Sequence, residues 1–244
     1  MKIYFAGGEG GSYNKILLRE GVKNRLESFF YLKKEPPSVR EFQSHLLDSG
    51  GYTARVKGVE IGVETFAAYC NQHGAKLAFN LDTNDIDETL RNQKFLETHA
   101  PKTYFIPIYH LSDYCERREL LHDFLRYPFI AVGGVAGVGG NKQIKEAFYK
   151  YVFRHTRDRV KVHGLGITDG KSLERYPWYS VDSSSWLSFA RYGNSKNFTD
   201  KKMMQYTSRT KHYHELAAME VQHYLRMQKF ITDLWKKRGV VWND

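Results

Sequence analysis

Three aspartates stand directly after short apolar runs of the chain, and their positions suit chemistry. Asp48, Asp82 and Asp182 end runs that read Leu-Leu, Leu-Ala-Phe-Asn-Leu and Tyr-Ser-Val. Buried parallel strands read as apolar runs, and α/β barrel enzymes carry their catalytic groups at the carboxyl ends of such strands. If the three carboxylates meet, like-charge repulsion raises the pKa of at least one. One protonated and one ionised carboxyl group is the pair that cleaves glycosidic bonds.

Two glycine-containing segments also follow strand ends. In Asp48-Ser49-Gly50-Gly51-Tyr52 the glycines either let backbone N–H groups approach a ligand or form a tight turn in which Asp48 caps the next helix. The segment 133–140 lies between a strand and a helix, where free N–H groups bind anions. It lacks the Gly-Lys-Ser/Thr of a P-loop and the spacing of a dinucleotide fingerprint. We therefore expect no nucleotide cofactor, and backbone contact with a base or a phosphate stays open.

The elements that must position these residues alternate along the chain. Amphipathic stretches of helical period separate most of the apolar runs, and Asp85 and Asp113 stand just before two of them as candidate helix caps. The helical stretches include 63–73, 86–99, 114–126 and 143–155. The candidate strands are 2–6, 27–32, 45–48, 76–81, 103–108, 129–133, 160–166 and 178–182.

Eight strands alternating with helices in 244 residues predict a (β/α)8 barrel, an α/β fold of the TIM-barrel type in one domain. A doubly wound open sheet is the alternative, because periodicity does not distinguish a closed sheet from an open one. We expect residues 1–193 to form the barrel and residues 194–244 to add a basic loop and a long basic C-terminal helix packed on it. Within that part, 193–208 reads as a loop and 210–238 as the helix.

The charge of the chain indicates an anionic partner. The formal net charge is +10, and residues 191–244 carry eleven Lys and Arg against five Asp and Glu. Nucleic acid is the usual partner of such a surface, although a solvated helix with extra lysines is the simpler interpretation. We name Arg191, Lys196, Lys201 and Lys202 as candidate contacts to a nucleic-acid backbone.

Cysteine content and hydropathy limit the classes of protein to which the chain can belong. Cys70 and Cys115 are the only cysteines, which excludes a disulfide scaffold. The pairs Cys70/His73 and His212/His214 have no second pair at zinc spacing, so we expect no metal. No apolar run approaches the ~20 residues that span a bilayer, and the N-terminus lacks the pattern of a signal peptide. We expect a cytoplasmic protein without membrane contact.

Four of these motifs together resemble the tRNA-guanine transglycosylase superfamily. The segment 48–52 resembles its Asp-Ser-Gly-Gly-Phe motif, and Gly133-Gly134-Val135-Ala136 is similar to its Gly-Gly-Leu-Ala loop. His163-Gly164-Leu165-Gly166 is similar to its Met-Gly-Val-Gly strand end, and Asp182 falls where that family keeps a nucleophilic aspartate. The resemblance runs in order from residue 3 to about 193, with Arg191 and Gly193 in an Arg- and Gly-containing segment.

The resemblance implies an enzyme that cleaves a base–sugar bond through a covalent aspartyl–sugar intermediate. Asp182 would attack the sugar C1′, and Asp48 would act as general acid and base on the departing and incoming bases. Asp82 would hydrogen-bond the base edge, and Tyr52 would stack on the base. The resemblance places the other base contacts at Ser49, Gly50, Gly51, His110, Gly133, Gly134, Val135 and Gly164.

Two departures select the branch of the family. The tRNA-acting members carry a Cys-rich zinc subdomain that this chain lacks, and their base-reading Gln-Gly-Gly segment is replaced by Tyr109-His110-Leu111. The small zinc-free branch that inserts 7-deazaguanines into DNA is more similar. Some relatives in that branch are DNA glycosylases that excise a modified base as antiviral defence. The implied partners are DNA, with RNA less favoured, and a free modified base as co-substrate.

Several functions therefore stand beside one another. Base exchange in DNA comes first, and a glycosylase that leaves an abasic site comes second. A non-catalytic nucleic-acid-binding barrel and a barrel enzyme for a phosphorylated metabolite are the alternatives from other classes. In either of the first two, the nucleotide must be flipped out of the stack so that C1′ reaches the barrel mouth.

Overall fold

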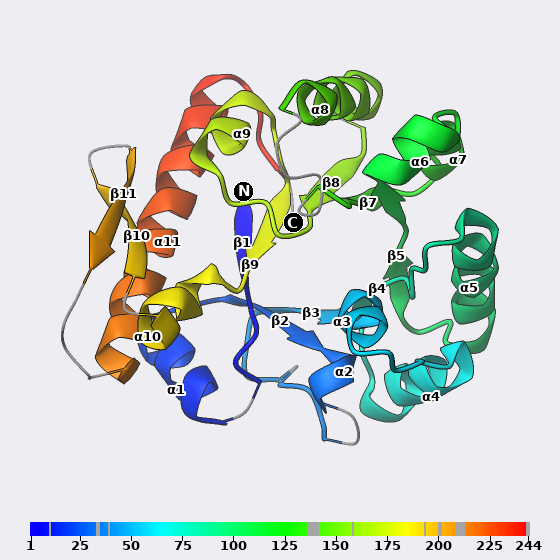
Figure 1. Ribbon diagram of the computed structural model, residues 1–244, viewed down its shortest axis with the longest axis horizontal. Helices are drawn as coiled ribbons and strands as arrows, with labels where there is room; N and C mark the ends of the chain where they lie inside the picture. Colours follow the sequence, from blue (N-terminus) through cyan, green and yellow to red (C-terminus); the bar gives the residue numbers. More distant parts are fainter. Residues whose placement is uncertain are drawn as a thin grey trace.

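Parallel strands and surrounding helices make up the computed structural model of the protein (Figure 1). The structure describes residues 1–242 except 10, 33–34, 39, 136–141, 158, 193, 200–201 and 208–212, and of residues 189, 194–199 and 202–207 it describes the backbone. The strands of the parallel sheet are β1 (Lys2–Ala6), β2 (Asn24–Ser28), β3 (Ser44–Asp48), β4 (Leu77–Phe79), β5 (Tyr104–Ile106), β6 (Ile108–His110), β7 (Phe129–Gly133), β8 (Lys161–Gly164) and β9 (Ser180–Ser183).

The sheet is a nearly closed barrel. Its strand order is β5-β4-β3-β2-β1-β9-β8-β7-β6, so the first and last strands are consecutive pieces of one segment, interrupted at Pro107. The first piece pairs with β4 and the second with β7. The carbonyl of Pro107 accepts a hydrogen bond from the Ala131 amide at 2.8 Å, which carries the pairing across the break. The (β/α)8 prediction is confirmed, with the two pieces filling one strand position.

Side chains alternate between the inside of the barrel and its helical coat, as the period of a strand requires. In β1, Tyr4 belongs to the interior cluster, whereas Ile3 and Phe5 belong to the cluster between sheet and helices. The interior cluster consists of Tyr4, Ala6, Leu26, Leu46, Phe79, Ile106, Ile108, Phe129, Ala131 and Tyr179. The last inward-facing side chains of the strands therefore lie at the end of an apolar barrel interior.

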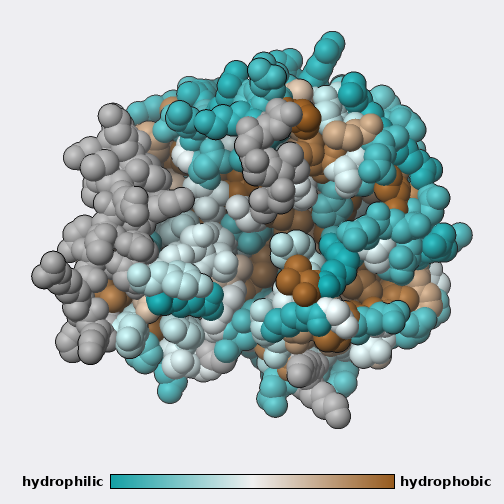
Figure 2. All heavy atoms as spheres, viewed as in Figure 1, coloured by the Kyte–Doolittle hydropathy of each residue, from teal (hydrophilic) through white to brown (hydrophobic). Residues whose placement is uncertain are grey.

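Helices follow the strands around the outside (Figure 1). They are α1 (Gly11–Arg19), α2 (Phe29–Leu32), α3 (Gly51–Val56), α4 (Val63–His73), α5 (Ile86–His99), α6 (Leu111–Glu116), α7 (Leu120–Phe124), α8 (Lys142–Thr156), α9 (Gly170–Arg175), α10 (Ser188–Tyr192) and α11 (Tyr213–Lys237), with a 3₁₀ turn at Ser185–Leu187. The bounds of α4 and α5 match the predictions, and Asp85 caps α5 by accepting the Glu88 amide at 2.7 Å. Hydrophilic residues cover most of the helical rim, and hydrophobic ones gather nearer the middle of the view (Figure 2).

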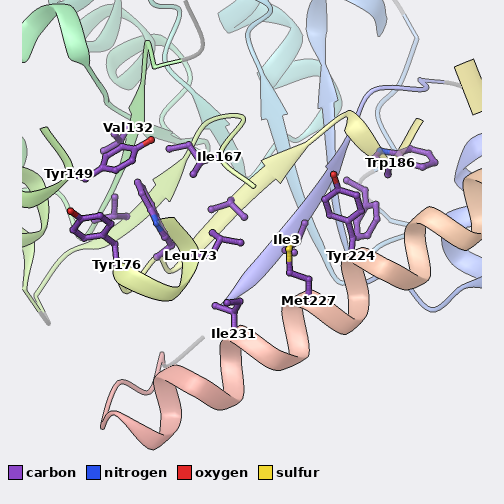
Figure 3. Packing of buried hydrophobic residues seen from close by; sticks show 14 of the residues in the cluster. Ile3, Val132, Tyr149, Ile167, Leu173, Tyr176, Trp186, Tyr224, Met227 and Ile231 are labelled. Atoms are coloured by element: carbon purple, nitrogen blue, oxygen red, sulfur yellow. The ribbon is translucent and has the colours of Figure 1, made fainter. Parts of the chain in front are cut away.

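The C-terminal helix packs on the outside of the barrel, as predicted. Met227 and Ile231 of α11 lie against Ile3 of β1 (Figure 3), and the side chain of Gln228 accepts the Ile3 amide at 2.6 Å. Beyond the helix, the ring of Trp242 contacts the ring of Tyr179 at 5.8 Å between centroids. The chain thus returns to the sheet after α11.

The predicted strand 27–32 is wrong by several residues. The strand is β2, and the aromatic run that follows it is the short helix α2. Arg25 and Glu27 are buried in β2 because other protein groups satisfy them. Arg25 donates to the carbonyls of Phe5, Gly7 and Leu26 at 2.6–2.9 Å. Because β2 contains these charged residues, its sequence looks polar, and the apolar run that follows it is the stretch that the pattern predicts as a strand.

Three further expectations are corrected. The stretch 114–126 is two short helices, α6 and α7, and Asp113 lies inside α6, where its carboxylate accepts the His110 amide at 2.7 Å. The predicted loop 193–208 contains an antiparallel hairpin of β10 (Asn194–Thr199) and β11 (Lys202–Thr207). Its polar sequence lacks the apolar alternation by which strands are usually recognised.

Candidate active site

The carboxyl ends of the strands bring the predicted acids into one cluster. Asp48 is the last residue of β3, Asp182 is the third residue of β9, and Asp82 follows β4 by three residues. Asp48 and Asp182 continue the inward series of Leu46 and Ser180 in their strands. Besides burial, the charges of Asp82 and Asp182 raise the pKa of Asp48, so both of these carboxyl groups lie within electrostatic reach of Asp48.

Asp48 has the strongest reason to hold a proton. Burial, then the charge of Asp82 and, more weakly, the charge of Asp182 raise its pKa to about 7, against the opposing effects of Ser28 and the Gly50 amide. That amide donates to Oδ2 at 3.1 Å. The predicted repulsion between carboxylates is present, but burial is the larger cause. A carboxyl group that titrates near neutrality is suited to give and take a proton.

Asp182 lies in a different environment. Its Oδ1 accepts hydrogen bonds from Nε2 of His163 at 3.1 Å and from the Gly166 amide at 2.9 Å. Both N–H donors thus hold the same oxygen of the carboxylate. Among the residues that the structure describes, Oδ2 accepts no hydrogen bond. The side chain is 14% exposed, so this oxygen belongs to a carboxylate that a substrate can reach.

Asp82 is bound by two cationic side chains. Its Oδ2 lies 3.0 Å from Nε2 of His110 and 3.4 Å from the guanidinium of Arg55. The His110 contact is an ion pair rather than a well-aligned hydrogen bond. Burial opposes the charged forms, but the mutual attraction of the pair outweighs it, so the pKa of Asp82 is lowered and that of His110 is raised. Asp82 therefore meets a substrate with one oxygen already engaged.

The glycines of the site lie where other parts of the protein come too close for a larger side chain. Gly50 has φ +78°, and a Cβ there would lie 2.4 Å from Cβ of Phe30. A Cβ on Gly51 would lie 2.9 Å from the carbonyl oxygen of Asp82, and one on Gly133 would lie 3.1 Å from Nδ1 of His110. Gly134 has φ +74°, and a Cβ there would lie 3.2 Å from the same Nδ1. These positions are closed to larger residues by the packing of the mouth itself.

The remaining predicted base contacts are distributed unevenly. Tyr52 is 71% exposed on α3, and Val135 is partly buried after β7. Ser49 is buried, and its hydroxyl accepts the Gly51 amide at 3.4 Å. Gly164 faces the helical coat, where a Cβ would lie 3.0 Å from Ile167 and from Trp178. Its role as a base contact stays a prediction.

The predicted backbone contacts lie beside the barrel, around α10 and the hairpin. Arg191 is exposed on α10, and Lys196 and Lys202 lie on β10 and β11. Lys201 and the segment 136–141, which holds most of the glycine-rich loop, lie outside the described residues.

Sequence reasoning missed His163, Ser180 and Arg55. His163 is fully buried in β8, two residues after Lys161, on the inward series of that strand. A histidine within an apolar run was the signal, since an imidazole in a barrel interior needs polar partners. Arg55 lies one helical turn after Gly51, which places it beside Asp82.

A cavity of about 430 Å³ adjoins Asp82. Its lining combines residues of α3, the loop from α3 to the start of α4, the segment after β4 and residues of α5. Gly51, Arg55, Ile61, Asp82, Thr83 and Asn92 are among the lining residues. Of the three carboxyl groups, that of Asp82 lines this cavity, beside the guanidinium of Arg55.

No protein-family model matches the chain, and no curated protein is significantly similar to it. Within the described part of the chain, no three His, Cys, Asp or Glu side chains form a cluster that could hold a metal ion. The described helices include none that is both long and apolar enough to cross a membrane.

Proposed function

We propose that the protein cleaves the N-glycosidic bond of a base in DNA through a covalent bond between Asp182 and the sugar. One observation carries the proposal. Two carboxyl groups at the same barrel mouth differ in environment, Asp48 with a pKa raised to about 7 and Asp182 with two N–H donors on one oxygen. Such a pair divides the roles of acid and nucleophile in glycosidic chemistry.

In the first step, Oδ2 of Asp182 forms a bond to C1′ as the bond from C1′ to the base nitrogen breaks. The electron pair of the broken bond stays on the base, which takes the proton of Asp48. A flipped nucleotide would lose its stacking partners, and the ring of Tyr52, which is exposed on α3, would replace one of them.

Base exchange is the leading form of the second step. Asp48, now ionised, takes a proton from an incoming base, whose nitrogen attacks C1′ and releases Asp182. The resemblance of the segments at 48–52, 133–136, 163–166 and 182 to the transglycosylase motifs supports this form and favours a 7-deazaguanine. The net charge of +10 supports a polynucleotide as the other substrate.

Hydrolysis is the second candidate, and the Asp82–His110 ion pair favours it. An imidazole stands where the resembled family reads the base with an amide and glycines, and it already engages Oδ2 of Asp82. A site built this way would select a different departing base. With water in place of the incoming base, the same residues would leave an abasic site, as in an antiviral glycosylase.

The test is incubation of duplex and single-stranded DNA with the protein, with and without isotope-labelled 7-deazaguanine base. Label in DNA with matching release of an unlabelled base supports exchange. Base release without label, together with strand cleavage in alkali, supports hydrolysis. Salt-dependent binding without base release or adduct contradicts catalysis and favours a binding barrel. Absence of salt-dependent DNA binding favours an enzyme of phosphorylated metabolites.

A further inference from the structure

His163 is a polar side chain enclosed in the apolar interior of the barrel. Its side chain is fully buried. Aromatic rings of three other strands surround it, with centroid distances of 4.9 Å to Phe79, 5.9 Å to Tyr4 and 6.5 Å to Phe129. Burying an imidazole among rings is costly unless both of its nitrogens find partners. Both do, and one partner is Asp182.

The two partners define the tautomer of the imidazole. Nδ1 lies 2.8 Å from Oγ of Ser180, and Nε2 lies 3.1 Å from Oδ1 of Asp182. The carboxylate oxygen accepts, so Nε2 carries a proton. Ser180 is fully buried, and among the described residues its hydroxyl has no acceptor other than Nδ1. If Nδ1 also carried a proton, the buried O–H would be left without an acceptor, so the neutral Nε2–H form satisfies every group.

We propose that His163 is a positioning residue that decides which oxygen of Asp182 reacts, and that Ser180 holds its ring by donating to Nδ1. The inference rests on the proposed function. Nε2–H of His163 and the Gly166 amide hold Oδ1 from two sides. The carboxylate cannot rotate without losing both hydrogen bonds, so Oδ2 is the oxygen presented to C1′.

The arrangement assigns separate tasks to the two oxygens. When Oδ2 bonds to C1′, the negative charge of Asp182 is lost, and Oδ1 becomes the carbonyl oxygen of the ester. When the incoming base or water attacks C1′, the Oδ2–C1′ bond breaks and its electron pair returns to the carboxylate. The N–H of His163 stabilises that returning charge through Oδ1. Loss of His163 should therefore slow release of Asp182 more than attack by it.

The first test is independent of activity. Nitrogen-15 shifts of the imidazole distinguish a protonated from an unprotonated ring nitrogen, and they are measured in the free wild-type protein at neutral pH. We expect the wild-type ring to carry its proton on Nε2 and none on Nδ1. Ser180→Ala should keep the proton on Nε2, because Asp182 still accepts it, and should shift the Nδ1 resonance because the hydrogen bond from Ser180 is lost. An Nδ1–H or doubly protonated ring in the wild type would overturn the inference and leave the proposed function untouched.

The second test compares variants in base release and in the steady-state amount of protein–DNA adduct. His163→Leu keeps apolar volume but removes the donor, and His163→Gln keeps an N–H donor. Ser180→Ala is the smaller change in case His163→Leu does not fold. Tyr4→Phe is the matched control, since the Tyr4 ring contacts His163 while its hydroxyl bonds Ser44.

For His163→Leu we expect turnover to fall about 10- to 100-fold, as when a group that orients a metal-bound histidine is removed. We also expect an unchanged KM for DNA and a larger fraction of protein trapped as adduct. Gln should restore part of the rate, and Tyr4→Phe should behave as wild type. Turnover and adduct at wild-type levels in a folded His163→Leu protein would overturn the inference. A wild type without adduct or base release would contradict the proposed function instead, and the nitrogen shifts would still decide whether His163 donates to Asp182.

Discussion

Asp48 and Asp182 are the same residue type on the same side of one barrel, yet their surroundings differ. Asp48 has a donor from its own loop, the Gly50 amide, and two neighbouring carboxylates that repel its charge. Asp182 has donors from outside its own strand, one from β8 and one from the loop after it. A parallel barrel can thus give the carboxyl groups at its strand ends different surroundings, through burial as well as through their neighbours.

Removing the anion should have the largest effect. Asp182→Asn keeps the size of the side chain but removes the nucleophile, so we expect no covalent adduct and at least a ~10³-fold loss of base release. Gel analysis of denatured protein–DNA mixtures measures the adduct, and DNA binding with an unchanged Tm serves as the control. Residual adduct in this variant would assign the nucleophile to another residue.

Removing the acid should cost less, because the nucleophile remains. For Asp48→Asn we expect a loss of about 10²- to 10⁴-fold in base release, the usual range for a general acid. In the wild type, single-turnover release should decline as the pH rises through about 7, since Asp48 then loses its proton. The variant should lack this decline. A pH profile in which Asp48→Asn keeps the same midpoint would remove Asp48 from the role.

The same substitution should stabilise the fold at alkaline pH. The pKa of Asp48 is raised from its ordinary value of 3.8 to about 7, so the folded state binds the proton more tightly than the unfolded chain. Stability therefore falls as the pH rises from about 4 to 7, by up to about 4 kcal/mol. Asp48→Asn should show a higher Tm than the wild type at pH 8 and none of this gain at pH 4. Equal Tm values at pH 8 would show that Asp48 is not destabilised by its surroundings.

His110 affects the pKa of Asp48 indirectly, through the charge of Asp82. His110→Asn removes the cation beside Asp82, so the Asp82 charge would act more strongly on Asp48 and move the midpoint of base release to higher pH. The ion pair involves a histidine of raised pKa, so its stabilisation is fully present below the ordinary value of 6.5 and is lost as the pH rises through the raised one. The Tm difference between wild type and variant should accordingly shrink at high pH. A midpoint that does not move would separate Asp82 electrostatically from Asp48.

The smallest effect concerns DNA affinity rather than either carboxyl group. Replacing Lys201 and Lys202 by serine should lower the slope of log affinity against log salt by about 2, roughly one for each phosphate that no longer meets a lysine. Lys76 and Lys102, exposed just before β4 and β5 at the other end of the barrel, provide a matched double variant that should leave the slope unchanged. Equal slopes for both double variants would place the hairpin outside the DNA path.

The residues that could be predicted from sequence are those at which an apolar run ends. Asp48, Asp82 and Asp182 were found because burial makes strands readable and a carboxylate ends each run. The barrel followed from counting such runs. Helices α4 and α5 were predicted at their bounds because their apolar residues recur with helical period.

What could not be predicted depends on contacts between distant residues. Arg25 and Glu27 hide a buried strand, because the groups that satisfy them come from elsewhere in the chain. The partners of His163 lie seventeen and nineteen residues away, on β9. The engagement of Asp82 by Arg55 and His110 depends on three separate strand ends meeting. The spacing of residues along the sequence does not show which strand ends come together in the fold.

The position of β1 has a consequence for the order in which the protein assembles. Its neighbours are β2 and β9, and Lys2 at one end of the chain pairs with Ser180 far along it. Its outer face is covered by α11, which is made later still. During synthesis the first strand therefore waits, with one edge unpaired and one face bare, until most of the chain has emerged. Pairing between segments that are distant in sequence is slow, and it leaves apolar strand edges exposed until it is complete. We therefore expect newly made chains to need chaperones at the ribosome more than the stability of the folded protein would suggest.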